Sequence, residues 1–123
     1  MTLLKVAHLG IKDTWSDETL VDHVNFTVQC GETLGIIGES GSGKSTLSRM
    51  ILVIEKPDKG QVTLNEQPIF RKKVRRHQIS AVFQNYTSSL HPFQNVQEIM
   101  FEVMCRCHHK RKDELEVEVI RLL

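Results

Sequence analysis

Residues 38–45, which read GESGSGKS, constrain the fold of this chain more than any other segment. They match the pattern G-x-x-x-x-G-K-[ST], in which a glycine-rich loop joins a buried strand to a helix. Glycine permits the backbone conformations and the close approach that a loop around phosphate groups requires. Inward N–H groups then form an anion-binding nest, and the helix that follows adds its positive end. The segment predicts a phosphate-binding loop, and the alternative is a chance glycine-rich turn.

The residues on both sides of the loop support this interpretation. Residues 33–37 (TLGII) form a continuous apolar run, which is typical of a strand buried on both faces of an α/β sheet. Residues 44–54 have apolar side chains at helical spacing, and the helix should stop before Pro57. We therefore expect Lys44 to contact the β- and γ-phosphates of a nucleotide. We expect the hydroxyl of Ser45 to ligate a Mg²⁺ ion that the phosphates bridge.

The rest of the chain reads as strands first and helices later. Alternating or short apolar stretches predict strands, and apolar residues at helical spacing predict helices. The predicted strands are residues 3–9, 20–28, 61–65 and 79–83, and the predicted helices are residues 96–104 and 112–123. This order of elements favours an α/β fold.

A second polar segment begins where the predicted strand 79–83 ends. Gln84 follows that strand, and the polar loop continues to Pro92. Ligands of α/β sheets lie at the carboxyl ends of strands, where a neutral amide can ligate Mg²⁺ or hold a water molecule. Taken alone, a glutamine here is more often a solvated loop residue.

The composition excludes several classes of protein. Sixteen basic against fifteen acidic side chains give a net charge of +1, which is too balanced for nucleic acid as the main partner. No apolar run reaches the ~18 residues of a membrane span, and the first residues lack a secretory signal, so we expect a cytoplasmic protein.

The basic residues at 71–76 favour a solvated face over a nucleic-acid or lipid contact. Residues 105–109 (CRCHH) favour reduced surface thiols over a metal site, because Cys107 does not share a helix face with the others.

These motifs together resemble a known family. Residues 38–45 and Phe83-Gln84 resemble the Walker A loop and the Q-loop of ABC-transporter ATP-binding subunits. Residues 88–92 (SSLHP) resemble the S-L-N-P stretch of the dipeptide, oligopeptide and nickel importer subfamily. The resemblance covers essentially the whole chain. It implies that residues 1–123 are the N-terminal part of a P-loop NTPase domain of the ABC type, with an antiparallel β portion beside a parallel core.

The resemblance also implies an activity and a site. An intact homologue would bind Mg-ATP and hydrolyse it to drive import of a peptide, nickel or a metal chelate. The ATP-contacting residues implied are Gly38, Glu39, Ser40, Gly41, Ser42, Gly43, Lys44, Ser45 and Thr46. Ser45 and Gln84 are the implied Mg²⁺ ligands, Lys44 and Gln84 are the implied catalytic residues, and Gln84 would couple the site to membrane subunits. Trp15, the only aromatic residue ahead of the second strand, is the candidate for stacking on adenine, with an ordinary loop anchor as the alternative.

The implied partners are a second ABC ATPase subunit, in a homo- or heterodimer, and transmembrane permease subunits at the inner face of the membrane. The family's L-S-G-G-Q signature, Walker B strand and switch histidine do not occur in these residues. We therefore expect nucleotide binding with little or no hydrolysis. The alternatives are another P-loop NTPase, such as a GTPase or kinase, or a truncated or hybrid remnant. Residues 1–45 look more like one ATPase of a staphylococcal nickel or opine-metallophore importer, and those from about 46 onward look more like its partner ATPase.

Two departures from the family carry structural expectations. Without a Walker B strand, residues 33–37 need another partner or become an open edge. The family usually has a glycine where Val53 stands, near the end of the first helix, and valine tolerates a left-handed cap poorly.

Overall fold

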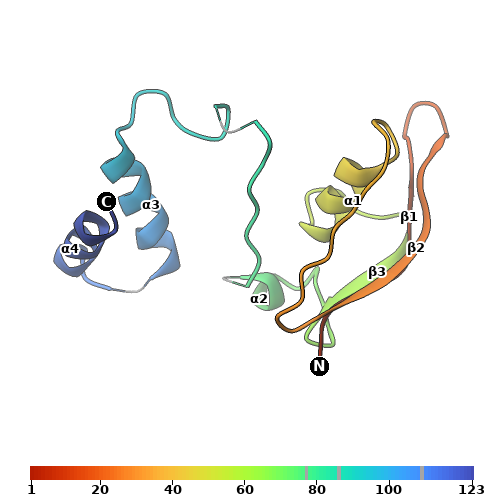
Figure 1. Ribbon diagram of the computed structural model, residues 1–123, viewed down its shortest axis with the longest axis horizontal. Helices are drawn as coiled ribbons and strands as arrows, with labels where there is room; N and C mark the ends of the chain where they lie inside the picture. Colours follow the sequence, from red (N-terminus) through yellow and green to blue (C-terminus); the bar gives the residue numbers. More distant parts are fainter. Residues whose placement is uncertain (77, 86, 109) are drawn as a thin grey trace. The chain divides into compact units, whose positions relative to one another are not determined.

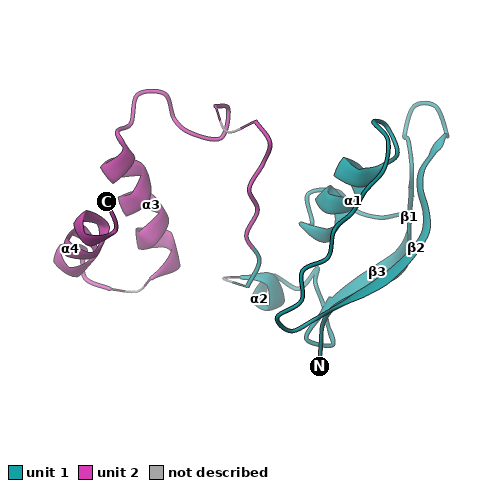
Figure 2. Cartoon of the chain, viewed as in Figure 1, with its two compact units in different colours: residues 1–79 teal, residues 80–123 magenta. Residues whose placement is uncertain are grey.

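The computed structural model describes residues 1–76, 78–85, 87–108 and 110–123. The chain divides into two compact units, Met1–Ile79 and Ser80–Leu123, shown in different colours in Figure 2. Each unit has its own core and is described by itself.

The first unit is built on an antiparallel sheet with the strand order β2-β1-β3-β4 (Figure 1). Its strands are β1 (Thr2–Lys12), β2 (Thr19–Gln29), β3 (Lys59–Leu64) and β4 (Gln67–Pro68). A short helix, α2 (Lys72–Arg75), follows β4 within the basic run and buries Val74. The strands predicted at residues 3–9, 20–28 and 61–65 are confirmed, and with them the antiparallel portion of the fold.

The core of this unit lies between the sheet and the helix α1 (Lys44–Ile51). Leu47 and Met50 are three residues apart, so they share one face of the helix, and both are buried. They pack with Val6, Leu9, Val21, Val62 and Ile69 of the same cluster. Complete burial of an aliphatic side chain contributes about 1.5–3 kcal/mol, so this contact holds α1 and the loop before it against the sheet.

α1 ends three residues earlier than predicted, in a Schellman turn. The N–H of Val53 donates to the Met50 carbonyl at 3.1 Å, and the N–H of Ile54 donates to the Arg49 carbonyl at 2.9 Å. Val53 takes the left-handed position of this turn, with φ of +60°. The expectation that valine occupies a position suited to glycine is therefore confirmed.

The strands predicted at residues 33–37 and 79–83 are wrong for the described part of the chain, where neither segment joins a sheet. Most of their apolar side chains are accordingly exposed, Ile37 by 97% and Val82 by 99%, whereas Ile79 packs against the core of the first unit. A strand persists only when a neighbour accepts and donates its backbone hydrogen bonds, and no described segment does so for these two. The described residues therefore form the antiparallel portion of the predicted fold without a parallel sheet.

The second unit ends in two helices, α3 (Val96–Cys107) and α4 (Lys112–Leu122), which confirm the helices predicted at residues 96–104 and 112–123. Asn95 begins α3 with a capping box: its Oδ1 accepts from the Glu98 N–H at 2.9 Å, and the Glu98 carboxylate accepts from the Asn95 N–H at 3.0 Å. The buried side chains between the helices are Met104, Leu115 and Val119, with Met100 and Phe101 packed against them. Among the described residues, no helix is both long enough and apolar enough to cross a membrane.

Candidate functional site

The glycine-rich loop at residues 38–45 turns sharply before α1. Gly43 is the N-cap of α1, with φ of +89°, and Gly41 has φ of +81°. The N–H of Ser42 donates to the Glu39 carbonyl at 3.2 Å, which closes the turn between them. Left-handed backbone at these two positions favours glycine, which adopts it without steric cost.

The end of the loop lies against the sheet. A Cβ atom on Gly43 would lie 2.5 Å from the carbonyl oxygen of Leu20 and 3.1 Å from Cγ2 of Val21. Any side chain at position 43 would therefore push the start of α1 away from β2. At Gly38 a Cβ atom would meet the hydroxyl oxygen of Ser42 at 2.7 Å, so this glycine also permits a close approach within the loop.

The side chain of Lys44 folds back across the loop. Its Nζ donates to the carbonyl oxygen of Gly38 at 2.6 Å, to that of Glu39, and to the hydroxyl oxygen of Ser42 at 3.2 Å. The ammonium thus lies within the curve of the loop, next to the N-terminus of α1. Since the helix dipole is positive at that end, positive charge is concentrated where a polyanion would enter.

The first turn of α1 supplies oxygen ligands without competing negative charge. The side chain of Ser45 is exposed and Thr46 is half-buried. No acidic residue occupies the first turn of the helix. Mg²⁺ prefers oxygen ligands, so the hydroxyl of Ser45 fits this ion chemically.

Trp15 lies in the connection between β1 and β2, and its side chain is 95% exposed. The turn is closed by other groups: the Asp13 N–H donates to the Glu18 carbonyl at 2.7 Å, and the Asp13 carboxylate accepts from the Ser16 hydroxyl at 2.7 Å. That hydroxyl, with the Ser16 N–H, lowers the pKa of Asp13 below its usual value. The indole is therefore not used as a packing anchor, and its ring faces solvent, where a ligand can reach it.

Gln84 belongs to the second unit and is exposed on an irregular segment. Further along this segment, the hydroxyls of Ser88 and Ser89 donate to the Asn85 carbonyl at 3.2 Å and 3.1 Å. Because Gln84 and the glycine-rich loop lie in different units, a shared Mg²⁺ site of Ser45 and Gln84 stays a prediction.

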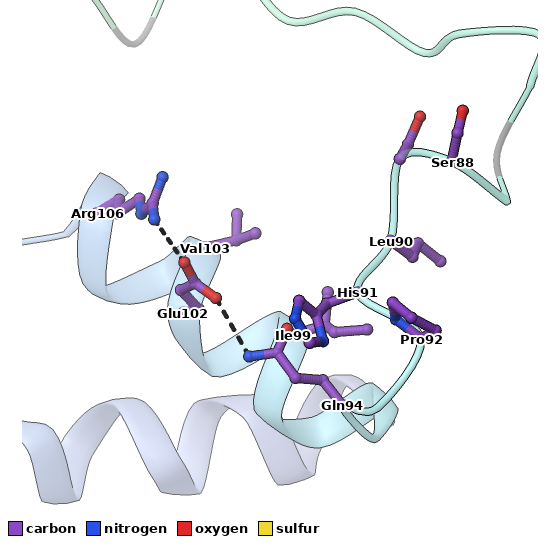
Figure 3. A pocket seen from close by; sticks show the side chains of 10 residues that line it. Ser88, Leu90, His91, Pro92, Gln94, Ile99, Glu102, Val103 and Arg106 are labelled. Carbon is purple, nitrogen blue, oxygen red and sulfur yellow. Dashed lines mark hydrogen bonds and ion pairs between the residues drawn. The ribbon is translucent and has the colours of Figure 1, made fainter.

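The second unit contains a groove that sequence reasoning did not find. It has a volume of about 620 Å³ and lies between the irregular segment and α3 (Figure 3). In the lining of the groove, the Glu102 carboxylate accepts hydrogen bonds from the Gln94 amide at 3.5 Å and from the Arg106 guanidinium (Figure 3). The lining residues are Ser88, Ser89, Leu90, His91, Pro92, Gln94, Ile99, Glu102, Val103 and Arg106. Residues 88–92 were visible in the sequence as a family-like run, but the groove requires α3 to pack beside them.

The cysteines lie apart from these features. Cys30, Cys105 and Cys107 are exposed free thiols, and for Cys105 and Cys107 this agrees with the surface thiols predicted there. His109 of the segment 105–109 lies outside the described residues. Within the described ranges, no group of three or more His, Cys, Asp or Glu side chains is arranged to hold a metal ion.

The ABC transporter family matches residues 21–122. The chain is 68% identical over 104 residues to the metal-staphylopine import system ATP-binding protein CntF of Staphylococcus aureus strain NCTC 8325, and 44% identical over 114 residues to CntD of S. aureus strain Mu50. Each match covers 85% of this chain and 42% of the relative. The nickel import ATP-binding protein NikE of Escherichia coli K12 is 32% identical over an alignment of 126 residues, and the match covers 93% of this chain and 47% of NikE. The chain thus spans less than half the length of these relatives.

Solved structures share the fold. The dimeric structure of the ABC transporter cassette MJ0796 matches 97% of this chain and 55% of its own, with a TM-score of 0.80 and 24% identity. Clostridium perfringens cbiO1, part of the ABC transporter complex cbiONQ, matches 98% of this chain and 48% of its own, with a TM-score of 0.75 and 27% identity. The predicted fold class, the N-terminal part of an ABC-type P-loop NTPase domain, is confirmed. With a family match that extends from β2 through the glycine-rich loop to α4, the chain belongs to the ABC transporter family of ATP-binding proteins.

Proposed function

We propose that this chain binds Mg-ATP through residues 38–45, as part of the ATP-binding subunit of a metal importer. The observation that carries the proposal is the Lys44 ammonium, which lies inside the curve of the loop, 2.6 Å from the Gly38 carbonyl. In that place it is positioned to exchange its loop carbonyl contacts for phosphate oxygens. Such a loop at the start of a helix is built for a polyphosphate.

Each residue of the loop has a role in this proposal. Lys44 would hold the β- and γ-phosphates, and the backbone N–H groups would surround them. The hydroxyl of Ser45 and the amide of Gln84 would hold Mg²⁺, which supplies charge neutralisation between the phosphates. The exposed ring of Trp15 would stack on adenine. The remaining contacts belong to Gly38, Glu39, Ser40, Gly41, Ser42, Gly43 and Thr46.

The reaction of the intact family is transfer of the γ-phosphoryl group to water. Lys44 would stabilise the charge that develops on the phosphate oxygens as water attacks in line. Residues 1–123, taken as a partial ABC domain, lack the Walker B and switch-histidine motifs. Since general-base catalysis alone commonly contributes about 10²–10⁴-fold, we expect this chain to bind ATP with little or no turnover.

The relatives support the proposed solute and partners. Their names specify metal-staphylopine and nickel import, and the similarity to them supports a nickel or metal-chelate solute over a peptide. The proposed partners are a second ABC ATPase subunit and transmembrane permease subunits, at the cytoplasmic face of the membrane. Gln84 would couple the nucleotide site to the permease, and the groove that follows it in the chain is the candidate surface for that contact.

Calorimetry with a non-hydrolysable ATP analogue tests the proposal. Wild type should bind the analogue more tightly with Mg²⁺ than without it, and Lys44→Ala should weaken binding by at least about tenfold, or 1.4 kcal/mol. Lys56→Ala, which removes an exposed lysine outside the loop, should bind as wild type does. Equal affinity in wild type and Lys44→Ala would exclude the loop as the site. Competition by GTP but not by ATP would indicate another class of P-loop NTPase.

The second candidate is a remnant without activity, either truncated or a hybrid of two paralogous ATPases. The exposed apolar residues at 33–37 and 80–83 favour it, because these segments have no strand partners among the described residues. ATP hydrolysis by the purified chain that Lys44→Ala abolishes would argue against a remnant. Two intact ATPase genes flanking this one at the locus would argue against a hybrid.

A further inference from the structure

Two histidines without an evident partner in the sequence meet across β1 and β2. The register of these strands shifts on both sides of the Leu9–Val24 pair. Each shift is a β-bulge, one on each strand, and a bulge re-aims the side chain it carries. His8 and His23 occupy left-handed positions in the two bulges, with φ of +52° and +50°.

The bulges bring the two imidazole rings into contact on an exposed surface. His8 Nδ1 lies 3.0 Å from His23 Nε2, and the ring centroids are 4.5 Å apart. The side chain of Asn25 braces both bulges, because its Oδ1 accepts from the His8 N–H at 2.8 Å and its Nδ2 donates to the His23 carbonyl at 2.9 Å. Behind the first bulge, a Cβ on Gly60 would lie 2.3 Å from the His8 carbonyl oxygen, so β3 passes too closely for any other residue. The backbone therefore holds both histidines in place.

The nitrogen separation suits a metal ion as well as a shared proton. Two nitrogen ligands at about 2.1 Å from an ion are about 3.0 Å apart when they subtend a right angle and about 3.4 Å apart in a tetrahedron. Imidazole is a preferred ligand of Zn²⁺, Cu²⁺ and Ni²⁺. Both nitrogens become ligands when each ring carries its proton on the other nitrogen, His8 on Nε2 and His23 on Nδ1.

We propose that His8 and His23 form a two-histidine site for a divalent transition-metal ion. The site takes Cu²⁺ most tightly, in line with the general order of affinities, and it also takes Ni²⁺ and Zn²⁺. Within the described ranges, no third His, Cys, Asp or Glu completes the set, so water fills the remaining positions and the ion exchanges readily. The site uses none of the residues assigned to ATP, and it stands whether or not the glycine-rich loop binds nucleotide.

Nuclear magnetic resonance of the histidine rings in the full chain tests the site. Substoichiometric CuCl₂ should broaden the Cε1–H signals of His8 and His23 first, because Cu²⁺ is paramagnetic. The signal of His91, whose ring lies 6.0 Å from that of Phe93, should persist. His8→Asn and His23→Asn assign the signals, and asparagine suits the left-handed backbone at both positions. Each variant should raise the Kd for Zn²⁺ in calorimetry at least about tenfold, whereas His91→Asn should not change it.

The exposed thiols are the main competitor for the ion, so Cys105→Ser/Cys107→Ser is titrated in parallel. The proposal predicts that His8 and His23 are still broadened first in that variant. Broadening that reaches all histidines equally, or that is lost with the two thiols, would overturn the site. Unchanged Zn²⁺ affinity in folded His8→Asn or His23→Asn would do the same. If a variant does not fold, the order of broadening in wild type decides the question.

Discussion

A Cβ atom on Gly43 would lie 2.5 Å from the carbonyl oxygen of Leu20, so the glycine-rich loop meets β2 at the residue that caps α1. Gly43→Ala should therefore suffer both the left-handed strain of alanine, about 1–2 kcal/mol, and a clash with the backbone of β2. We expect a loss of more than about 2 kcal/mol in the free energy of unfolding, measured by urea denaturation.

Two other glycines provide matched controls. Gly41 is also left-handed, with φ of +81°, but its Cβ would meet nothing within 4 Å. Gly41→Ala should cost only the strain, about 1 kcal/mol. Gly35→Ala, with open space and no positive φ, should stay within about 0.5 kcal/mol of wild type. Equal losses in Gly43→Ala and Gly41→Ala would show that contact with β2 is unimportant.

Val53 occupies the left-handed position after α1, with φ of +60°, and it also packs against the core of the first unit. In Val53→Gly the release of backbone strain, about 1–2 kcal/mol, should offset the lost side-chain contacts. We expect the free energy of unfolding of Val53→Gly to equal that of wild type or to exceed it by up to about 1 kcal/mol. Val24→Gly, at a partly buried position within β2, should instead cost roughly 2 kcal/mol. A similar loss at both positions would mean that Val53 is not strained.

The Lys110 ammonium lies 2.8 Å from the Glu118 carboxylate. This hydrogen bond, with the attraction between the charges, lowers the pKa of Glu118 below its ordinary 4.5 and raises the pKa of Lys110 above its ordinary 10.5. The Glu118 contribution to stability is therefore present above pH 4.5 and is lost as the pH falls through the folded-state pKa. The Lys110 contribution is present below pH 10.5 and is lost as the pH rises through its folded-state pKa.

Carboxyl resonances followed against pH measure this coupling. Lys110→Ala should raise the pKa of Glu118 toward 4.5, because the largest cause of the depression is removed. Arg121→Ala removes only a weaker attraction and should raise that pKa less. A larger shift in Arg121→Ala than in Lys110→Ala would contradict the ion pair.

Trp15 is the single tryptophan of the chain and its ring is exposed to solvent. Tryptophan fluorescence therefore reports on the surroundings of this one side chain. If the indole stacks on adenine, the emission should change on addition of Mg-ATP and much less with inorganic triphosphate. Trp15→Ala should then weaken ATP binding by about 1–3 kcal/mol, by analogy with stacking of bases on aromatic side chains. Identical responses to ATP and triphosphate would remove Trp15 from the proposed site.

Features that depend on neighbouring residues could be predicted from the sequence alone. The left-handed glycines at 41 and 43, the helix that begins at Lys44 and the left-handed Val53 are local properties of the backbone, although the helix ends at Ile51 and not at residue 54. The early strands were equally readable, because alternation of apolar side chains specifies which face of a strand is buried.

Features that depend on distant partners could be seen only in the folded chain. Residues 33–37 have the composition of a buried strand, yet a strand also needs a neighbour for its backbone hydrogen bonds, and the described residues provide none. The contact between His8 and His23 joins residues fifteen apart through two bulges, and bulges are set by the register between strands. The groove beside α3 likewise forms only where the preceding segment packs on that helix. Pairing, register and packing are relations between segments, so they arise only when the chain has folded.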